Sequence, residues 1–362
     1  MSANSYGLEA LSLAESAAWD ELIRGCAGEE LFHRRAWLDF LAASRNATIT
    51  QHAIREGEAT VGYLSGGIVR KGPFRIFGSP LKGWGTNFMG PVATAQIDQV
   101  GLLAAIDGLA RDESLAMTEL ESRLLDDSHL DAAGYEVELG WTYLVPLSPR
   151  HPDTMWKGLD STCRNRLRKA EKAGLTIEDT DDPAVAGEFY NQYTELMARK
   201  HLLPPYPRDY PRLLFSHLKK ADLLFALRVR DASGRVLATG LYPHDDRTVY
   251  FWGGASWEDG RELCPNEFLH WNAMSLAATR GLTCYNMCGY GRFKKKFGGT
   301  LVTLKRWHKY HWRSAGWARR AYEVYFRRRQ RIDGWLQAIR SRYRRRLGAS
   351  PSQPDHDAPA AD

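Results

Sequence analysis

The feature that most constrains the fold of this chain is an internal repeat. Residues 57–64 read Gly-Glu-Ala-Thr-Val-Gly-Tyr-Leu, and residues 234–241 read Gly-Arg-Val-Leu-Ala-Thr-Gly-Leu. Each stretch is a hairpin turn entering a strand that contains a further glycine, and in each case a helix and a late strand follow, at 116–120 or 283–287. The likeness is one of pattern, with few identities. It predicts one structural unit used twice.

Each copy is predicted to be an α/β domain with a mixed, mostly antiparallel sheet flanked by helices. The length agrees with this, because 362 residues exceed one typical domain. We expect a first domain over residues 1–152 and a second over 153–312. A basic amphipathic helix is expected over 313–347, and a disordered tail rich in Pro, Ala and Asp over 348–362.

Composition places the chain among folded proteins of a reducing compartment. It is 44% hydrophobic with 12 Trp, no run is long and apolar enough to cross a bilayer, and the N-terminus does not resemble a signal peptide. The five cysteines are odd in number and irregularly spaced. Cys284 and Cys288 lack a second ligand pair at zinc-site spacing, so no metal site is predicted. We expect a cytoplasmic protein, with the inner face of the plasma membrane as an alternative location.

Positive charge is concentrated near the C-terminus. Residues 313–346 hold 12 Arg against Glu323 and Asp333, an excess of ten that leaves the rest of a chain of net charge +6 slightly acidic. Residues 314–347 also repeat apolar residues every three or four positions, as an amphipathic helix does. This pattern favours a polyanion, either RNA or an anionic membrane surface. Docking on the protein's own core, with solvated arginines, is the alternative.

Two glycine-rich stretches have a composition suited to ligands. Residues 78–91 combine several glycines with aromatic residues, although an ordinary connection is an equal alternative. Residues 285–299 place an arginine and three lysines between glycines, which let the backbone turn sharply and approach a ligand. Phe293 and Phe297 are four residues apart and share a helical face. Taken alone, this second stretch favours a surface turn.

Three segments resemble a known family. The first is a predicted basic helix at residues 163–174, which reads Cys-Arg-Asn-Arg-Leu-Arg-Lys-Ala-Glu-Lys-Ala-Gly. The second, residues 188–206, is a predicted helix followed by a proline-rich loop. The third, residues 281–299, contains the run Arg-Phe-Lys-Lys-Lys-Phe-Gly-Gly. Together they resemble the Fem-type aminoacyltransferases, which act on peptidoglycan precursors, and the related CelD-like acetyltransferases. Both are tandem folds of the GNAT acetyltransferase type. The resemblance covers roughly residues 15–312, and it implies transfer of an acyl group from an activated carrier to an amine.

The resemblance also implies roles for individual residues. Lys294 and Phe293 match the family's catalytic pair, in which the lysine places a cation beside the developing oxyanion and the ring packs on the carrier's base or ribose. Arg164, Arg168 and Lys172 recur every four residues and form one stripe, expected beside the interdomain groove, where they would bind substrate phosphates. A solvated helix face is the equal alternative for that stripe.

Other positively charged and titratable residues receive weaker assignments. Arg199 and Tyr206 are candidates for binding the acceptor. Lys295 and Lys296 are expected on a solvated face, with contact to substrate phosphates as the alternative. No general base is assigned, because a lone histidine is more often a packing residue. The titratable residues of the second half that could serve are His201, His244, His270 and Glu267.

The identity of the acyl donor depends on residues 259–266. A GNAT protein that uses CoA presents a (Q/R)-x-x-G-x-(G/A) loop whose amides hold pyrophosphate. The equivalent stretch here has one glycine, two acids and a proline. This favours aminoacyl-tRNA as the co-substrate, with no resident cofactor and with a phosphorylated or glycan-linked amine of a cell-envelope precursor, or a peptide, as acceptor. Acyl-CoA-dependent acetylation of an amino sugar and non-catalytic RNA or membrane binding are the alternatives.

Overall fold

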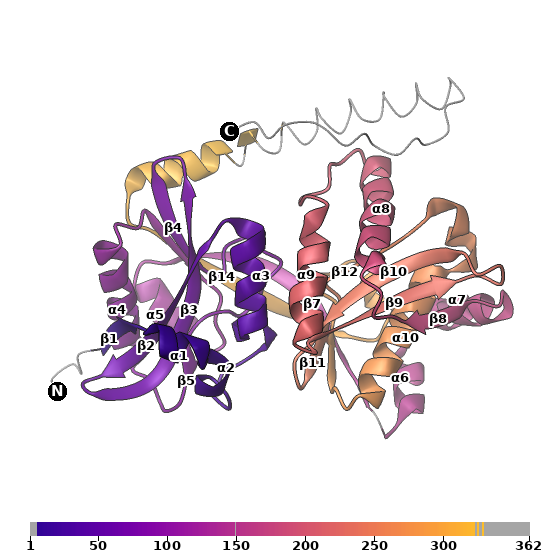
Figure 1. The fold of residues 1–362 in the computed structure, drawn as a ribbon, viewed down its shortest axis with the longest axis horizontal. Helices are drawn as coiled ribbons and strands as arrows, with labels where there is room; N and C mark the ends of the chain where they lie inside the picture. Colours follow the sequence, from indigo (N-terminus) through magenta and orange to yellow (C-terminus); the bar gives the residue numbers. More distant parts are fainter. Residues whose placement is uncertain (1–5, 149, 323, 326–327, 329–362) are drawn as a thin grey trace.

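The computed structural model describes residues 6–148, 150–322, 324–325 and 328 (Figure 1). The elements of the first half are β1 (Tyr6–Ala10), α1 (Leu13–Ala17), α2 (Trp19–Leu22), η1 (Leu31–His33), α3 (Arg35–Arg45), β2 (Thr48–Glu56), β3 (Ala59–Lys71), β4 (Phe74–Ser79), β5 (Val92–Ala93), α4 (Gln99–Asp112), β6 (Met117–Leu120), α5 (Asp127–Ala132) and β7 (Glu136–Pro146). The elements of the second half are α6 (Pro152–Gly158), α7 (Ser161–Lys172), β8 (Thr176–Asp179), α8 (Ala184–Arg199), α9 (Asp209–Lys220), β9 (Leu224–Arg230), β10 (Val236–Pro243), β11 (Thr248–Tyr250), β12 (Gly253–Ser256), η2 (Glu258–Leu263), α10 (Pro265–Thr279), β13 (Cys284–Asn286), α11 (Arg292–Lys295) and β14 (Thr300–Tyr310).

Within the described residues, the strands form two sheets. The larger has ten strands in the order β1-β2-β3-β4-β6-β14-β7-β13-β11, with β5 paired to β3, and the smaller has the order β12-β10-β9-β8. β14 pairs antiparallel with both β6 and β7, and β7 pairs antiparallel with β13. The two halves therefore share one sheet through β7 and β14.

The predicted repeat is visible in the topology. In the first half, β4 pairs antiparallel with β3 and parallel with β6, and α4 lies between β4 and β6 in the sequence. In the second half, β10 pairs antiparallel with β9, and β11 lies parallel to β13, with α10 between them. This confirms the predicted fold class, an α/β protein made of two units with mostly antiparallel sheets.

Helices α3 and α9 join the two halves face to face (Figure 1). Tyr210, Leu214 and Leu218 recur every four residues of α9, so they form one apolar face, and all three are buried. The ring of Tyr210 lies 4.9 Å from that of Phe40 of α3, centroid to centroid. A buried core shared by both halves therefore fixes their relative position.

Most helix ends lie where local sequence signals predict them. Asp160 caps α7, as aspartate commonly does at a helix N-terminus, and its Oδ1 accepts a hydrogen bond of 2.6 Å from the amide of Cys163. Ala18 leaves the helical conformation, so α1 and α2 are separate short helices.

The C-terminal helix begins at residue 313. Its predicted continuation over 329–347 and the predicted disordered tail over 348–362 lie outside the described residues. Among the helices that the structure describes, none is long and apolar enough to cross a bilayer.

Candidate functional site

In the second half, the consecutive strands β11 and β12 belong to different sheets, and an open site lies where they diverge. β11 pairs with β13 of the larger sheet, whereas β12 pairs with β10 of the smaller one. Phe251 remains bonded to the larger sheet, since its amide donates to the carbonyl of Asn286 at 2.8 Å. Trp252 follows directly, and its side chain lines a cavity. The divergence of the two strands thus places an aromatic ring at the edge of an open site.

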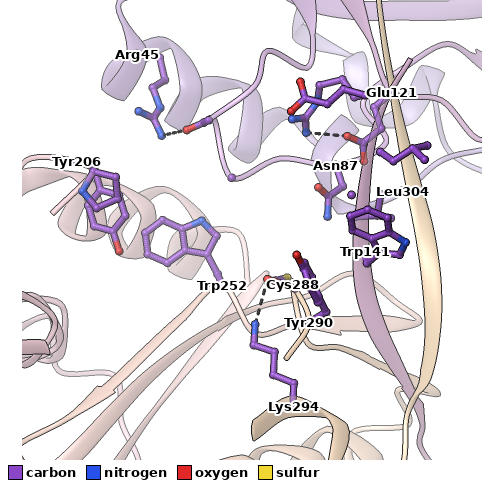
Figure 2. A pocket seen from close by; sticks show the side chains of 18 of the residues that line it. Arg45, Asn87, Glu121, Trp141, Tyr206, Trp252, Cys288, Tyr290, Lys294 and Leu304 are labelled. Atoms are coloured by element: carbon purple, nitrogen blue, oxygen red, sulfur yellow. Dashed lines mark hydrogen bonds and ion pairs between the residues drawn. The ribbon is translucent and has the colours of Figure 1, made fainter. Parts of the chain in front are cut away.

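This cavity lies at the junction of the two halves and has a volume of about 770 Å³ (Figure 2). The second half contributes Tyr206, Trp252 and the turn after β13, which ends in Lys294. The first half contributes Glu121, the glycine-rich loop after β4 and the middle of β7. Lys294 and Tyr206, two of the residues assigned from the sequence, therefore lie in the same cavity.

Lys294 presents its ammonium group at the cavity wall. Its Nζ donates to the carbonyl oxygens of Met287 at 2.5 Å and Cys288 at 3.2 Å. Since a lysine ammonium carries three N–H donors, these two bonds leave one for a ligand. Burial lowers the pKa of Lys294 below its usual 10.5. The side chain is a fixed donor with one unused proton.

The turn beside Lys294 requires glycine. Gly289 has φ +140°, and a Cβ there would lie 3.1 Å from Nζ of Lys294. A larger residue would crowd the ammonium group and cover the approach to it. Burial also raises the pKa of the neighbouring Cys288 thiol to about 12. Cys288 is therefore a neutral thiol and a poor nucleophile.

Aromatic rings form the wall of the cavity beside α9. Tyr206 stacks on Tyr193 with ring centroids 5.4 Å apart and an angle of 5° between the planes. The ring of Trp252 lies 5.6 Å from those of Tyr206 and Tyr210. The guanidinium of Arg45 covers Tyr210 at 4.1 Å. Together these rings form an aromatic wall against which a planar or cyclic ligand group can pack.

The opposite wall, from the first half, is polar. Glu121 is almost completely buried, and one of its oxygens accepts a 2.8 Å bond from Arg306. Burial raises the pKa of Glu121, and the charge of Arg306 opposes that rise only in part. Asn87 points into the space between Glu121 and Trp141 and lies across the cavity from Lys294 (Figure 2). A carboxyl group and an amide thus face the lysine across the cavity.

Phe293 and Lys296 lie on another side of the same turn. Phe293 is 38% exposed and packs on His270, whose ring centroid is 5.4 Å away, and it is not among the residues that line the cavity. The expectation that Lys296 lies on a solvated face is wrong. It is buried, it forms an ion pair with Glu267, and its Nζ lies 4.1 Å from the centroid of the Phe293 ring. Lys295 is exposed, as expected.

The buried cluster of Lys296 is held together by charge. Glu267 in the first turn of α10 accepts bonds from Lys296 and, at 2.7 Å, from Arg166. Burial opposes the ionisation of Glu267, but these two bonds and the charge of Lys296 outweigh it and hold its pKa below the usual value. Lys296 and Glu267 therefore join the turn to α10.

The basic stripe of α7 does not meet the cavity. Arg164 donates to the carbonyls of Leu159 and Lys157, and Arg168 donates to Asn165 at 3.1 Å. α7 lies on the outer side of the second half, away from the first half (Figure 1). Arg164, Arg168 and Lys172 therefore lie apart from Lys294 and Tyr206.

Arg199 also lies apart from Lys294. At the C-terminal end of α8 it forms ion pairs with Glu258 and, at 3.9 Å, with Glu195. It is absent from the lining of the cavity. Of the residues predicted to bind substrate, Tyr206 is thus the one that shares the cavity with Lys294.

In the stretch that corresponds to the pyrophosphate loop of CoA-dependent GNAT proteins, charged side chains are already paired within the protein. Residues 258–263 form the short helix η2, in which Glu258 pairs with Arg261, and Asp259 pairs with Arg235. α10 then begins with a proline, which lacks an N–H, and buries the carboxyl group of Glu267 in its first turn. The end of α10 that would receive an anion already holds one.

Comparison with known proteins agrees with this architecture. Residues 159–296 match the family model described as an acetyltransferase (GNAT) domain. The crystal structure of FemX superposes with a TM-score of 0.64 at 14% identity, covering 82% of this chain and 96% of that one. The chain has a tandem GNAT fold. A tandem GNAT protein from the clavulanic acid biosynthesis pathway is also similar, with a TM-score of 0.52, 10% identity and coverage of 84% and 98%.

A further similar structure is that of a conserved protein of unknown function from Bacteroides thetaiotaomicron, with a TM-score of 0.56, 10% identity and coverage of 83% and 98%. No curated protein sequence matches the chain. The predicted likeness to the Fem-type proteins is thus confirmed at the level of the tandem GNAT fold, which is what solved structures of these identities establish. The second GNAT unit is the one that the family model recognises, and Lys294 lies near its end.

Three residues of the tandem GNAT cavity are not predicted by the sequence patterns. Asn87 lies in the glycine-rich loop 78–91, whose composition favours a ligand but singles out no residue. Glu121 comes directly after β6, and a carboxyl group at the C-terminal end of a buried strand is a usable signal for a site. Trp252 carries no such signal, because its position depends on the divergence of β11 and β12.

Proposed function

We propose that this chain is an N-acyltransferase that moves an acyl or aminoacyl group from an activated carrier, with aminoacyl-tRNA favoured, to an amine. A cell-envelope precursor or a peptide carries that amine. The observation that carries the proposal is the position of Lys294, which presents one unused N–H to a cavity between two GNAT units. The family match to a GNAT acetyltransferase domain supports the reaction class.

In the proposed reaction, the neutral amine of the acceptor attacks the carbonyl carbon of the carrier ester. A carbon–nitrogen bond forms, and the carbonyl oxygen becomes an oxyanion that accepts the remaining N–H of Lys294. The bond from carbon to the carrier oxygen then breaks, and the proton lost by the amine ends on that oxygen. A preorganised donor at an oxyanion is worth about 10²–10³ in rate, because it meets charge that appears only in the transition state.

Glu121 is the proposed carrier of that proton. It lines the same cavity as Lys294 and lies on the opposite wall (Figure 2). Burial raises the pKa of Glu121 above its usual value, which makes the carboxyl group a better proton acceptor. In its ionised form it also attracts the ammonium group of the incoming acceptor. Arg306 fixes the orientation of the carboxyl group.

The rings of Tyr206 and Trp252 are proposed to position the acceptor. The two rings lie 5.6 Å apart, centroid to centroid, and both line the cavity, so a sugar or another ring of the acceptor can pack against them. Asn87 supplies an amide donor and acceptor on the facing wall. Positioning of this kind converts a bimolecular attack into an effectively intramolecular one.

The N-terminal end of α10 is the reason for favouring aminoacyl-tRNA as the acyl donor. Because Glu267 fills the first turn of that helix and Pro265 removes an amide, the helix offers little to a pyrophosphate. This supports aminoacyl-tRNA over CoA. Acyl-CoA-dependent N-acetylation of an amino sugar is the second candidate, and the family match to an acetyltransferase domain favours it.

The two donors are separated by one assay. The purified chain is incubated with charged tRNA and, separately, with acetyl-CoA, each with amine acceptors that include an amino sugar and a peptide. We expect product from charged tRNA and none after ribonuclease treatment. Transfer from acetyl-CoA that ribonuclease does not affect would replace the favoured donor with the second candidate. Turnover that is unchanged in Lys294→Ala would contradict the proposed site with either donor.

A further inference from the structure

The described start of the C-terminal helix comprises residues 313–322, 324–325 and 328, and it exposes one face to solvent. Ala315 and Gly316 are buried, whereas Trp317 is 74% exposed and Val324 is 53% exposed. On the protein side, Arg319 donates to Glu119 at 3.0 Å, and at the base of the helix Trp312 packs on Phe74 of β4 with ring centroids 6.3 Å apart. The helix is thus attached by one face along the first half, beside β4 (Figure 1).

The outward face alternates arginine with apolar residues. Positions 313, 317, 320, 324 and 328 are separated by three or four residues, so they form one stripe along the helix. The stripe reads Arg, Trp, Arg, Val, Arg, and every one of these side chains is exposed. Tyr325, 58% exposed, lies beside it. Among the described residues, the three arginines of the stripe have no ion-pair partner.

In the part of the chain that the structure describes, this face is not packed on the protein's core. Ala315 and Arg319, which attach the helix, lie on its other side, and Trp317 and Val324 are exposed. An exposed tryptophan, tyrosine and valine flanked by exposed arginines have the composition of a helix that lies in a membrane interface. RNA would use the arginines, but it gives no reason for an exposed valine in the middle of the stripe.

We infer that the stripe formed by Arg313, Trp317, Arg320, Val324 and Arg328 is a docking surface for an anionic membrane. The sequence of the arm supports this, since residues 313–346 carry 12 Arg against two acids while the rest of the chain is slightly acidic. Arginines near an anionic bilayer each contribute to binding, and tryptophan occupies the headgroup region. The partner is therefore a lipid surface that presents phosphate headgroups of net negative charge.

The attachment of the helix connects this surface to the cavity. Arg319 shares Glu119 with Arg306, which lies 3.5 Å from that carboxyl group and also binds Glu121. Arg306 and Glu121 line the cavity. A helix bound to the membrane would thus hold the cavity close to the lipid surface. Membrane binding by this face does not depend on transfer at Lys294.

The test is flotation of the full chain with vesicles of phosphatidylcholine and phosphatidylglycerol, and with vesicles of phosphatidylcholine alone. We expect binding to the first and little to the second. Replacing Arg313 and Arg320 with glutamine lowers the partition coefficient about fivefold for each arginine, and Trp317→Ala lowers it about tenfold. The matched control replaces Arg24 and Arg150, which are exposed elsewhere, with glutamine and leaves it unchanged.

Failure of the wild-type chain to float, or equal flotation of the stripe variants and the control, would overturn the docking surface. A labelled single-stranded RNA in a fluorescence anisotropy titration gives the alternative outcome. RNA binding that needs Arg313 and Arg320, together with no flotation, would assign the face to RNA instead. Thermal melting of each variant checks its fold, and since all the substituted side chains are exposed we expect unchanged transitions.

Discussion

Two lysines of one short turn have opposite environments. Lys294 reaches a cavity between the two halves, bonds to two backbone carbonyls and keeps one N–H unused. Lys296 is buried against Glu267 and serves to join the turn to α10. Residues two apart on a helical turn point in different directions, so the same local run of positive charge supplies one group for a ligand and one for the core. Positive charge in a sequence motif therefore does not by itself identify the group that acts.

The largest effect is expected for Lys294→Ala. Losing the donor should lower kcat about 10²–10³-fold, because the charge acts on an oxyanion that exists only in the transition state. The unfolding free energy should change little. Steady-state kinetics and denaturant unfolding measure the two quantities. Lys295→Ala, at the exposed lysine between the two, is the matched control and should change neither.

The next effect separates Lys296 from Lys294. Lys296→Met should reduce the unfolding free energy by about 3 kcal/mol, because it leaves the carboxylate of Glu267 buried with a single partner. Turnover per folded molecule should stay near that of the wild type. The double variant Lys296→Met with Glu267→Met should recover much of the stability, since replacing both members of a buried pair costs less than breaking it. A stable single variant with lost turnover would reverse the assigned roles of the two lysines.

A smaller effect is expected at the aromatic wall. Trp252→Leu should weaken binding of a ring-bearing acceptor by about 1–3 kcal/mol, the usual worth of one stacking contact. This should appear in KM more than in kcat. Trp156→Leu is the matched control, because Trp156 packs on Trp271 away from the cavity. Equal changes in KM for both variants would show that the wall does not bind the acceptor.

The smallest expected effect is a pH dependence of the unfolding free energy, caused by the buried ion pair of Glu267 and Lys296. The pKa of Glu267 is lower in the folded state than its usual 4.5, so its contribution to stability is present above pH 4.5 and is lost as the pH falls through the folded-state pKa. Denaturant unfolding of the wild type below pH 4.5 should therefore lose stability more steeply than that of Glu267→Gln. Identical slopes for both proteins would contradict the ion pair.

The fold can be predicted from the sequence because its signals are local and repeated. Each of these signals determines structure only within a few residues of its own position. They include the hairpin at 57–64, its counterpart at 234–241, the helix cap at Asp160 and the glycine turns. The basic motif predicts an exposed Lys296, but the side chain is buried. Its burial depends on Glu267, which lies 29 residues earlier in α10. Asn87 and Glu121 face Lys294 only because the two halves pack together, and Trp252 lines the cavity because β11 and β12 diverge. Neither arrangement is encoded in one short stretch of sequence.

The account is tested most directly by a crystal structure of the chain bound to a phosphonamidate analogue of the tetrahedral intermediate, in which a phosphoryl oxygen replaces the oxyanion. The measured quantity is the distance from that oxygen to Nζ of Lys294. We expect a charge-assisted hydrogen bond of about 2.7–2.9 Å, with the analogue lying between Lys294 and Glu121. An analogue bound elsewhere, or with its oxygen out of reach of Lys294, would contradict the assignment of this cavity as the site of acyl transfer.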